Sequence, residues 1–89
     1  MRKEDINMEY RSEKERKFEI VYRSYADDVY RACLYLTKDQ KVAQDIAEQV
    51  FIEFYDSFET IKEKYMLAYL IRMVKDSVYY HQKSRREDL

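Results

Sequence analysis

The sequence predicts an all-α domain, a small bundle of three main helices. Glycine and proline are both absent from the 89 residues, and a chain without them has few ways to form the tight turns that join β-strands. Apolar residues recur every three or four positions in three stretches, which is the spacing of one helix face. Hydrophobic residues make up 46% of the chain and charged residues 39%, a mixture typical of one globular domain with a densely charged surface.

The first predicted helix follows a polar segment. Residues 1–12 lack clear periodicity and are predicted to form a flexible N-terminal tail, with an extra helical turn as the alternative. The helical domain is expected over residues 13–86, and residues 87–89 as a C-terminal end that a second domain would follow. The apolar face of the first helix, about six turns long, consists of Phe18, Val21, Tyr22, Tyr25, Val29, Cys33 and Leu36.

The second and third helices are delimited by polar residues. Thr37, Lys38 and Asp39 interrupt the first pattern, and the Asp39 side chain is well placed to cap the helix that follows. The second apolar face consists of Val42, Ala43, Ile46, Ala47, Val50, Phe51, Phe54 and Phe58. A turn is expected over residues 59–64. The third apolar face consists of Met66, Tyr69, Leu70, Met73, Val74, Ser77 and Val78, and the helix ends in a basic cluster at residues 83–86. No single helix can bury its face alone, so the three must pack together or against a partner.

Several functional classes are excluded by composition. Without glycine there is no phosphate-binding loop. The chain has one cysteine, Cys33, and one histidine, His81. A single cysteine cannot form an internal disulfide, and together the two residues cannot supply the ligands of a structural zinc site. His81 is the one candidate base for a Ser-His-acid triad, and nothing near it in sequence marks a nucleophile. We therefore expect no enzyme, no metal and no cofactor, and we interpret Cys33 as a small buried apolar residue. No signal peptide or membrane span is visible, which favours the cytoplasm.

The charge is unevenly distributed along the chain. Residues 37–59 carry two basic and six acidic side chains, a net charge of −4, whereas residues 60–86 carry seven basic and two acidic ones, a net charge of +5. This division suggests two different partner surfaces, although solvated helix faces would give the same pattern. In residues 69–86, tyrosines and cations cannot all face one core, so several rings must lie at the surface. Such a surface suits nucleic acid, and a tyrosine-rich protein interface is the alternative.

Three motifs in order resemble region 2 of the bacterial sigma-70 family, in particular its extracytoplasmic-function type. Residues 18–32 resemble an opening helix with the patterns "LY-x-x-Y" and "(V/L)YR-x-A". Residues 36–51, LTKDQKVAQDIAEQVF, are similar to "LTGD…AEDLVQEVF", and residues 69–76, YLIRMVKD, are similar to "WLYRIARN". The resemblance covers residues 18–86.

The resemblance implies a role in transcription initiation. In the family, the second helix docks on the β′ clamp coiled coil of core RNA polymerase, and the third captures the single-stranded non-template strand of the promoter minus-ten element. The implied polymerase-binding residues are Asp45, Glu48, Gln49 and Glu53. The implied DNA-binding residues are Tyr69, Arg72, Lys75, Asp76, Tyr79, Tyr80, Lys83, Arg85 and Arg86, of which the last two would grip phosphates. An anti-sigma factor is a further partner that the resemblance allows, and no membrane is expected.

The sequence also departs from the family pattern. The family's Gln-Glu pair is reversed here as Glu48-Gln49, which moves one charge about 100° around the helix and alters the expected docking. Tyr69 replaces a tryptophan. Asp76 replaces an asparagine, so that an anion should oppose DNA binding unless Arg72 or Lys75 neutralises it. The rival hypothesis is therefore a sigma-like protein-interaction module that has lost promoter melting, and a purely structural bundle is a third.

Overall fold

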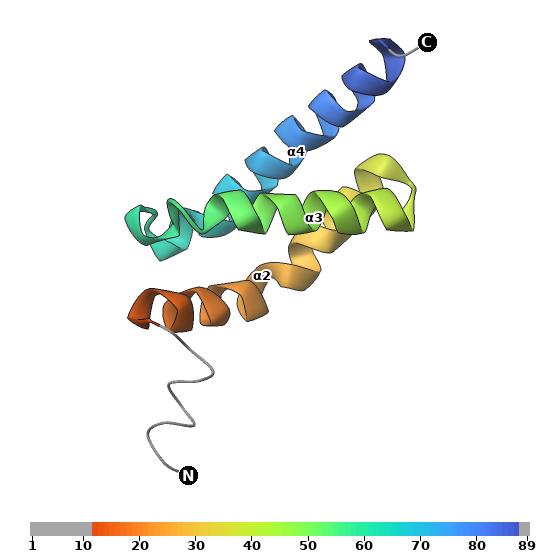
Figure 1. The fold of residues 1–89 in the computed structure, drawn as a ribbon. Helices are drawn as coiled ribbons and strands as arrows, with labels where there is room; N and C mark the ends of the chain where they lie inside the picture. Colours follow the sequence, from red (N-terminus) through yellow and green to blue (C-terminus); the bar gives the residue numbers. More distant parts are fainter. Residues whose placement is uncertain (1–11, 88–89) are drawn as a thin grey trace.

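Three long helices make up the fold of the computed structural model, which describes the backbone of residues 12–87 and the side chains of residues 12–84 (Figure 1). They are α2 (Glu13–Thr37), α3 (Gln40–Phe54) and α4 (Glu63–Glu87), with a short 3₁₀ helix, η1 (Phe58–Thr60), between the last two. No strand occurs in this part of the chain. The predicted three-helix, all-α class is thus confirmed. The predicted tail, apart from Ser12, lies outside the described residues.

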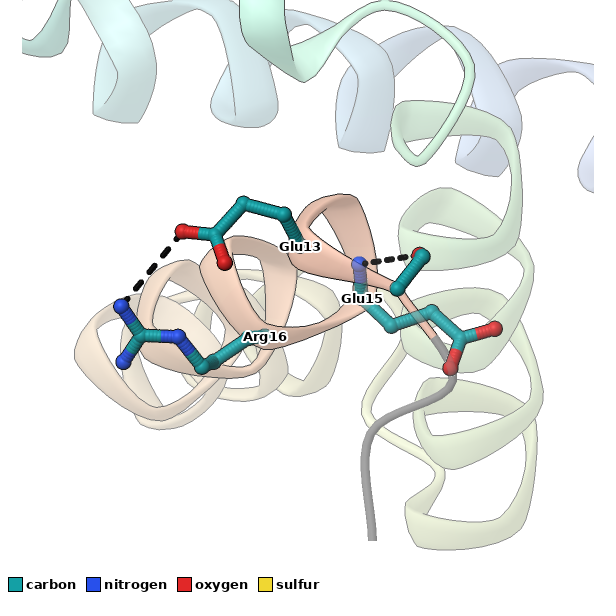
Figure 2. A network of polar contacts seen from close by, with 4 residues as sticks. Glu13, Glu15 and Arg16 are labelled. Atoms are coloured by element: carbon teal, nitrogen blue, oxygen red, sulfur yellow. Dashed lines mark hydrogen bonds and ion pairs between the residues drawn. The ribbon is translucent and has the colours of Figure 1, made fainter. Parts of the chain in front are cut away.

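Helix α2 begins at a side-chain cap. Ser12 has an extended backbone, and its Oγ accepts a hydrogen bond from the backbone N–H of Glu15 at 3.1 Å. Next to it, the Arg16 guanidinium pairs with the Glu13 carboxylate at 3.4 Å (Figure 2). The capped amide would otherwise lack a partner within the helix, so the cap explains why the helix starts directly after Ser12.

The turn between α2 and α3 is fixed by two residues. Lys38 takes the left-handed conformation, with φ 60°, and its backbone N–H donates to the Leu34 carbonyl at 2.8 Å. This is a common way to end a helix, although glycine is the residue that favours it and is the residue that the family motif has at this position. Asp39 then caps α3 by accepting from the Val42 N–H at 3.0 Å, as the sequence predicted.

The second predicted helix was too long. Helix α3 ends at Phe54, one turn before Phe58, and the chain turns over residues 55–57 before entering η1. Phe58 nevertheless reaches the core, where it is 2% exposed and its ring centroid lies 5.3 Å from that of Phe18. An apolar residue four positions after Phe54 can reach the core from a continuing α-helix or from a turn followed by a 3₁₀ helix. Periodicity alone could not distinguish these two backbone conformations. Helix α4 correspondingly begins at Glu63, inside the segment predicted as a turn.

Helix α3 is the centre of the core. It supplies six of the thirteen buried apolar side chains among the described residues, and α2 and α4 both pack against it as well as against each other. Helix α4 contributes Met66, Leu70, Val74 and Val78 at intervals of four, which leaves its opposite face exposed. Cys33 is fully buried, as predicted, and burial raises the pKa of its thiol to about 11. None of the described helices is long and apolar enough to cross a membrane.

Candidate functional site

The exposed face of α4 carries a line of cations. Because the buried residues of α4 recur every four positions, Arg72, Lys75 and Lys83 lie opposite the core with Tyr79 among them, and all four are exposed. None of the three cations forms an ion pair with a residue whose side chain the structure describes. We call Arg72, Lys75, Tyr79 and Lys83 the basic stripe. Its charges remain available to an anionic ligand.

Exposed tyrosines lie along and beside the basic stripe. Tyr79 is 60% exposed and Tyr80 67%, and their rings meet edge to face with centroids 5.6 Å apart. Tyr69 is the least exposed of the predicted tyrosines, at 38%, because its ring leans on Phe54 with centroids 5.7 Å apart. It therefore connects the core to this surface. Rings held by neighbours in this way lose less freedom when they stack on a base.

Sequence reasoning left one exposed ring out of the predicted site. Tyr65 is 55% exposed, and the Lys64 ammonium lies 5.2 Å from its ring centroid. Tyr65, Arg72 and Tyr79 follow one another at intervals of seven, which places them on one side of α4. That spacing was the signal that could have identified Tyr65. The backbone of Arg85 and Arg86 continues the helix, and their side chains lie outside the described part.

Asp76 lies beside the basic stripe and is not neutralised by it. Its carboxylate is exposed and makes no ion pair with Arg72 or Lys75. It lines a groove between α3 and α4 of about 590 Å³. The anion that the sequence singled out therefore stands at the border of the stripe and faces helix α3.

The groove between α3 and α4 brings the two predicted sets of residues together. Asp45, Gln49 and Glu53 line it from α3, and Asp76, Tyr80 and His81 from α4, over apolar side chains that include Ile46 and Met73. Gln49 Nε2 donates to the Glu53 carboxylate at 3.1 Å, whereas His81 Nε2 is buried without a hydrogen-bond partner. We call Asp45, Glu53 and Asp76 with the space between them the acidic groove. It combines three carboxylates that have no cationic partner among the described side chains.

Glu48 belongs to a different groove, between α2 and α3. This groove has a volume of about 440 Å³ and is otherwise lined by side chains that are largely apolar or aromatic, namely Phe18, Tyr22, Phe51, Ile52 and Tyr55. Ile52 is 64% exposed, which is unusual for a large aliphatic side chain at the centre of a helix face. The reversed Glu48-Gln49 pair thus sets the charge at the α2 side of α3 and the amide at the α4 side. We call Tyr22, Phe51, Ile52 and Tyr55 with Glu48 the apolar groove.

The described part of the chain contains no group of three or more His, Cys, Asp or Glu side chains that could hold a metal ion. The carboxylates of the acidic groove are spread over two helices and do not form such a group. The described surface has three main features: a basic, tyrosine-bearing stripe, an acidic groove beside it, and an apolar groove on the other side of α3.

Comparison with known proteins identifies the family. The model of the family Sigma-70 region 2 matches residues 21–87. The ECF RNA polymerase sigma factor SigM of Bacillus subtilis (strain 168) is 26% identical over 68 residues, which cover 75% of this chain and 42% of SigM. The ECF sigma factor SigX of the same organism is 27% identical over 77 residues, which cover 82% of this chain and 40% of SigX.

The chain spans about two fifths of the length of these curated relatives. No solved structure gives a significant match. The family match nevertheless extends over all three helices, from the middle of α2 to the end of α4, and agrees with the motifs quoted above. The chain therefore belongs to the sigma-70 region 2 family, whose members are transcription initiation factors and not enzymes.

Proposed function

We propose that this domain binds core RNA polymerase through α3 and the single-stranded non-template strand of a promoter minus-ten element through α4. The observation that carries the proposal is the basic stripe. On one face of α4, exposed tyrosine rings lie among cations that have no partner among the described side chains. Bases stack on such rings, and phosphates pair with such cations.

The two kinds of side chain have different tasks in this proposal. Tyr79 and Tyr80 present ring faces to unstacked bases, each stack contributing about 1–3 kcal/mol. Arg72, Lys75 and Lys83 position the strand through its phosphates and carry no sequence information themselves. The helix end with Arg85 and Arg86 extends the same set of phosphate contacts.

Polymerase binding is assigned to the exposed face of α3. The apolar groove offers Ile52 and Tyr22 as anchors that are already partly desolvated, and Glu48 at its edge suits a basic partner surface such as the β′ clamp coiled coil. Asp45, Gln49 and Glu53 lie on the neighbouring side of the same helix and would extend the contact. An apolar centre with charged residues around it is the usual arrangement of a protein interface.

The proposal can be tested on the whole chain. A labelled single-stranded DNA selected from a randomised pool should bind more tightly than its scrambled version, and the clamp coiled coil should be retained by the immobilised domain. Tyr79→Ala with Tyr80→Ala should weaken the DNA complex by tenfold or more, at about 1.4 kcal/mol per factor of ten. Tyr35→Ala is the matched control, because Tyr35 is also a highly exposed tyrosine, at 73%, but lies on α2. Failure of both the coiled-coil and the strand measurements would sink the proposal.

One observation favours the rival function, a protein-interaction module without promoter melting. The Asp76 carboxylate lies beside the stripe without a cationic partner among the described side chains and should repel the strand. Asp76→Asn removes the charge and restores the amide of the family motif, so single-strand affinity should rise if DNA binding is the task. A module that only binds proteins should be indifferent to this change, as measured by fluorescence anisotropy.

A further inference from the structure

Two surfaces of opposite charge share one stretch of α4. The basic stripe carries three cations between residues 72 and 83, and the acidic groove carries three carboxylates, one of them Asp76 in the same stretch. We propose that the chain associates with a second copy of itself, α4 against α4 about a two-fold axis. The basic stripe of each copy then lies against the acidic groove of the other.

Adjacent complementary patches are what a two-fold contact requires, because the same face must serve as both partners. The stripe and the groove meet this condition, since Asp76 lies four positions from Arg72 and three from Tyr79, which places it beside both on the surface of α4. The charges are also equal in number and opposite in sign. A basic segment of another protein would satisfy the groove alone, whereas a second copy satisfies both surfaces at once.

The course of α3 determines which charges meet. Phe54, at the end of α3, contacts Tyr69 near the start of α4, while Asp45, near the start of α3, shares the groove with Tyr80, His81 and Ser84. The two helices are therefore antiparallel. Stripe lies against groove on both sides when the two-fold axis runs along α4, so that the two α4 helices are parallel and in register. The Arg72 of the second copy then lies at the end of the groove that Glu53 lines, and its Lys83 at the end that Asp45 lines.

Side chains near the proposed axis also leave surface or a polar atom uncovered. Tyr79 and Tyr80 contact each other but are among the most exposed large hydrophobic residues that the structure describes, and His81 Nε2 is buried without a hydrogen bond. Covering the rings removes apolar surface from water. The contact of one helix face and one groove is nevertheless small for a stable dimer, so we expect a dissociation constant on the order of 10–100 µM and a marked dependence on salt.

Association would hide the surface assigned to DNA. The basic stripe and Tyr80 are used in both contacts, so dimer and single-strand complex exclude each other. This consequence rests on the proposed function. The association itself does not, and the two can be tested separately.

The test is sedimentation equilibrium of the full chain over about 5–500 µM, at about 0.05 M and about 0.5 M salt. The wild type should dimerise at low salt, with at least about tenfold weaker association at high salt. Asp45→Lys with Glu53→Lys should weaken association at least about tenfold. The matched control, Asp28→Lys with Glu59→Lys, changes the net charge equally at exposed positions outside both grooves and should keep at least about half of the affinity.

A charge exchange makes the test specific. Arg72→Glu with Lys83→Glu should also prevent self-association, yet a mixture of this variant with Asp45→Lys/Glu53→Lys should form a heterodimer, because each surface regains an opposite partner. A chain that is monomeric throughout, or two variants that do not combine although their circular dichroism is native, would overturn the proposal.

Addition of a single-stranded oligothymidine should convert dimer to monomer. A dimer unaffected by bound DNA would overturn the exclusion while leaving the association in place.

Discussion

The salt dependence of single-strand binding is the prediction that the structure makes most quantitative. Three described cations of the basic stripe have no partner among the described side chains, and each phosphate contact to a single strand contributes about −0.7 to the slope of log affinity against log salt. The stripe alone therefore predicts a slope of about −2, and participation of Arg85 and Arg86 would bring it to about −3.5. For the smaller value, a fourfold rise in salt weakens binding about 20-fold.

The perturbation is Arg72→Gln with Lys75→Gln, which removes two of these charges and keeps polar side chains of similar length. The slope should become shallower by about 1.4. Arg31→Gln is the control, because Arg31 is an exposed cation on α2, away from the stripe, and its slope should match the wild type. The assay is fluorescence anisotropy of a labelled single strand at four or more salt concentrations. An unchanged slope in the double variant would show that these cations do not contact phosphates and would refute the assignment.

Three further predictions concern the scaffold. Phe54→Ala should cost about 3–5 kcal/mol of unfolding free energy, because the ring is fully buried. Ile52→Ala, on the exposed side of the same helix, should cost less than about 1 kcal/mol. Urea unfolding compares the two variants, and equal losses would contradict the burial pattern. Asp39→Ala removes the cap of α3 and should cost about 1 kcal/mol in the same assay. Burial raises the pKa of Cys33 from 9.0 to about 11, so the unfolded chain loses the thiol proton at a lower pH than the folded chain does. The stability that burial of the thiol confers is therefore complete below pH 9 and falls as the pH rises from 9 to about 11. Cys33→Ala should therefore lose less stability than the wild type between pH 9 and 11, as pH-dependent urea unfolding can show.

Local rules account for most of the fold. The all-helical class, most of the three apolar faces and the cap at Asp39 follow from backbone preferences and side-chain spacing, and the structure confirms them. Tyr22 and Tyr69 were placed on apolar faces, yet they are 43% and 38% exposed. Phe58 differs in its backbone. Its burial was predicted correctly, but it lies in the short 3₁₀ helix η1, where the sequence predicted that the second α-helix would continue. A ring four positions after Phe54 would face the core from a continuing helix, and it also does so from a short 3₁₀ turn that folds back. The energy of burial is similar in both cases, so the pattern does not choose between them.

The candidate surfaces divide in the same way. Sequence alone identified the basic, tyrosine-rich helix, because consecutive residues on a helix cannot share one buried face, and it identified the family through ordered motifs that the family match confirms. The tertiary structure decided how the acidic residues of α3 are distributed: Glu48 joins the apolar groove beside α2, while Asp45 and Glu53 join Asp76 beside α4. Which neighbour a helix face meets depends on how three helices pack. That arrangement is set by the fit of side chains distant in sequence, and no local pattern contains it.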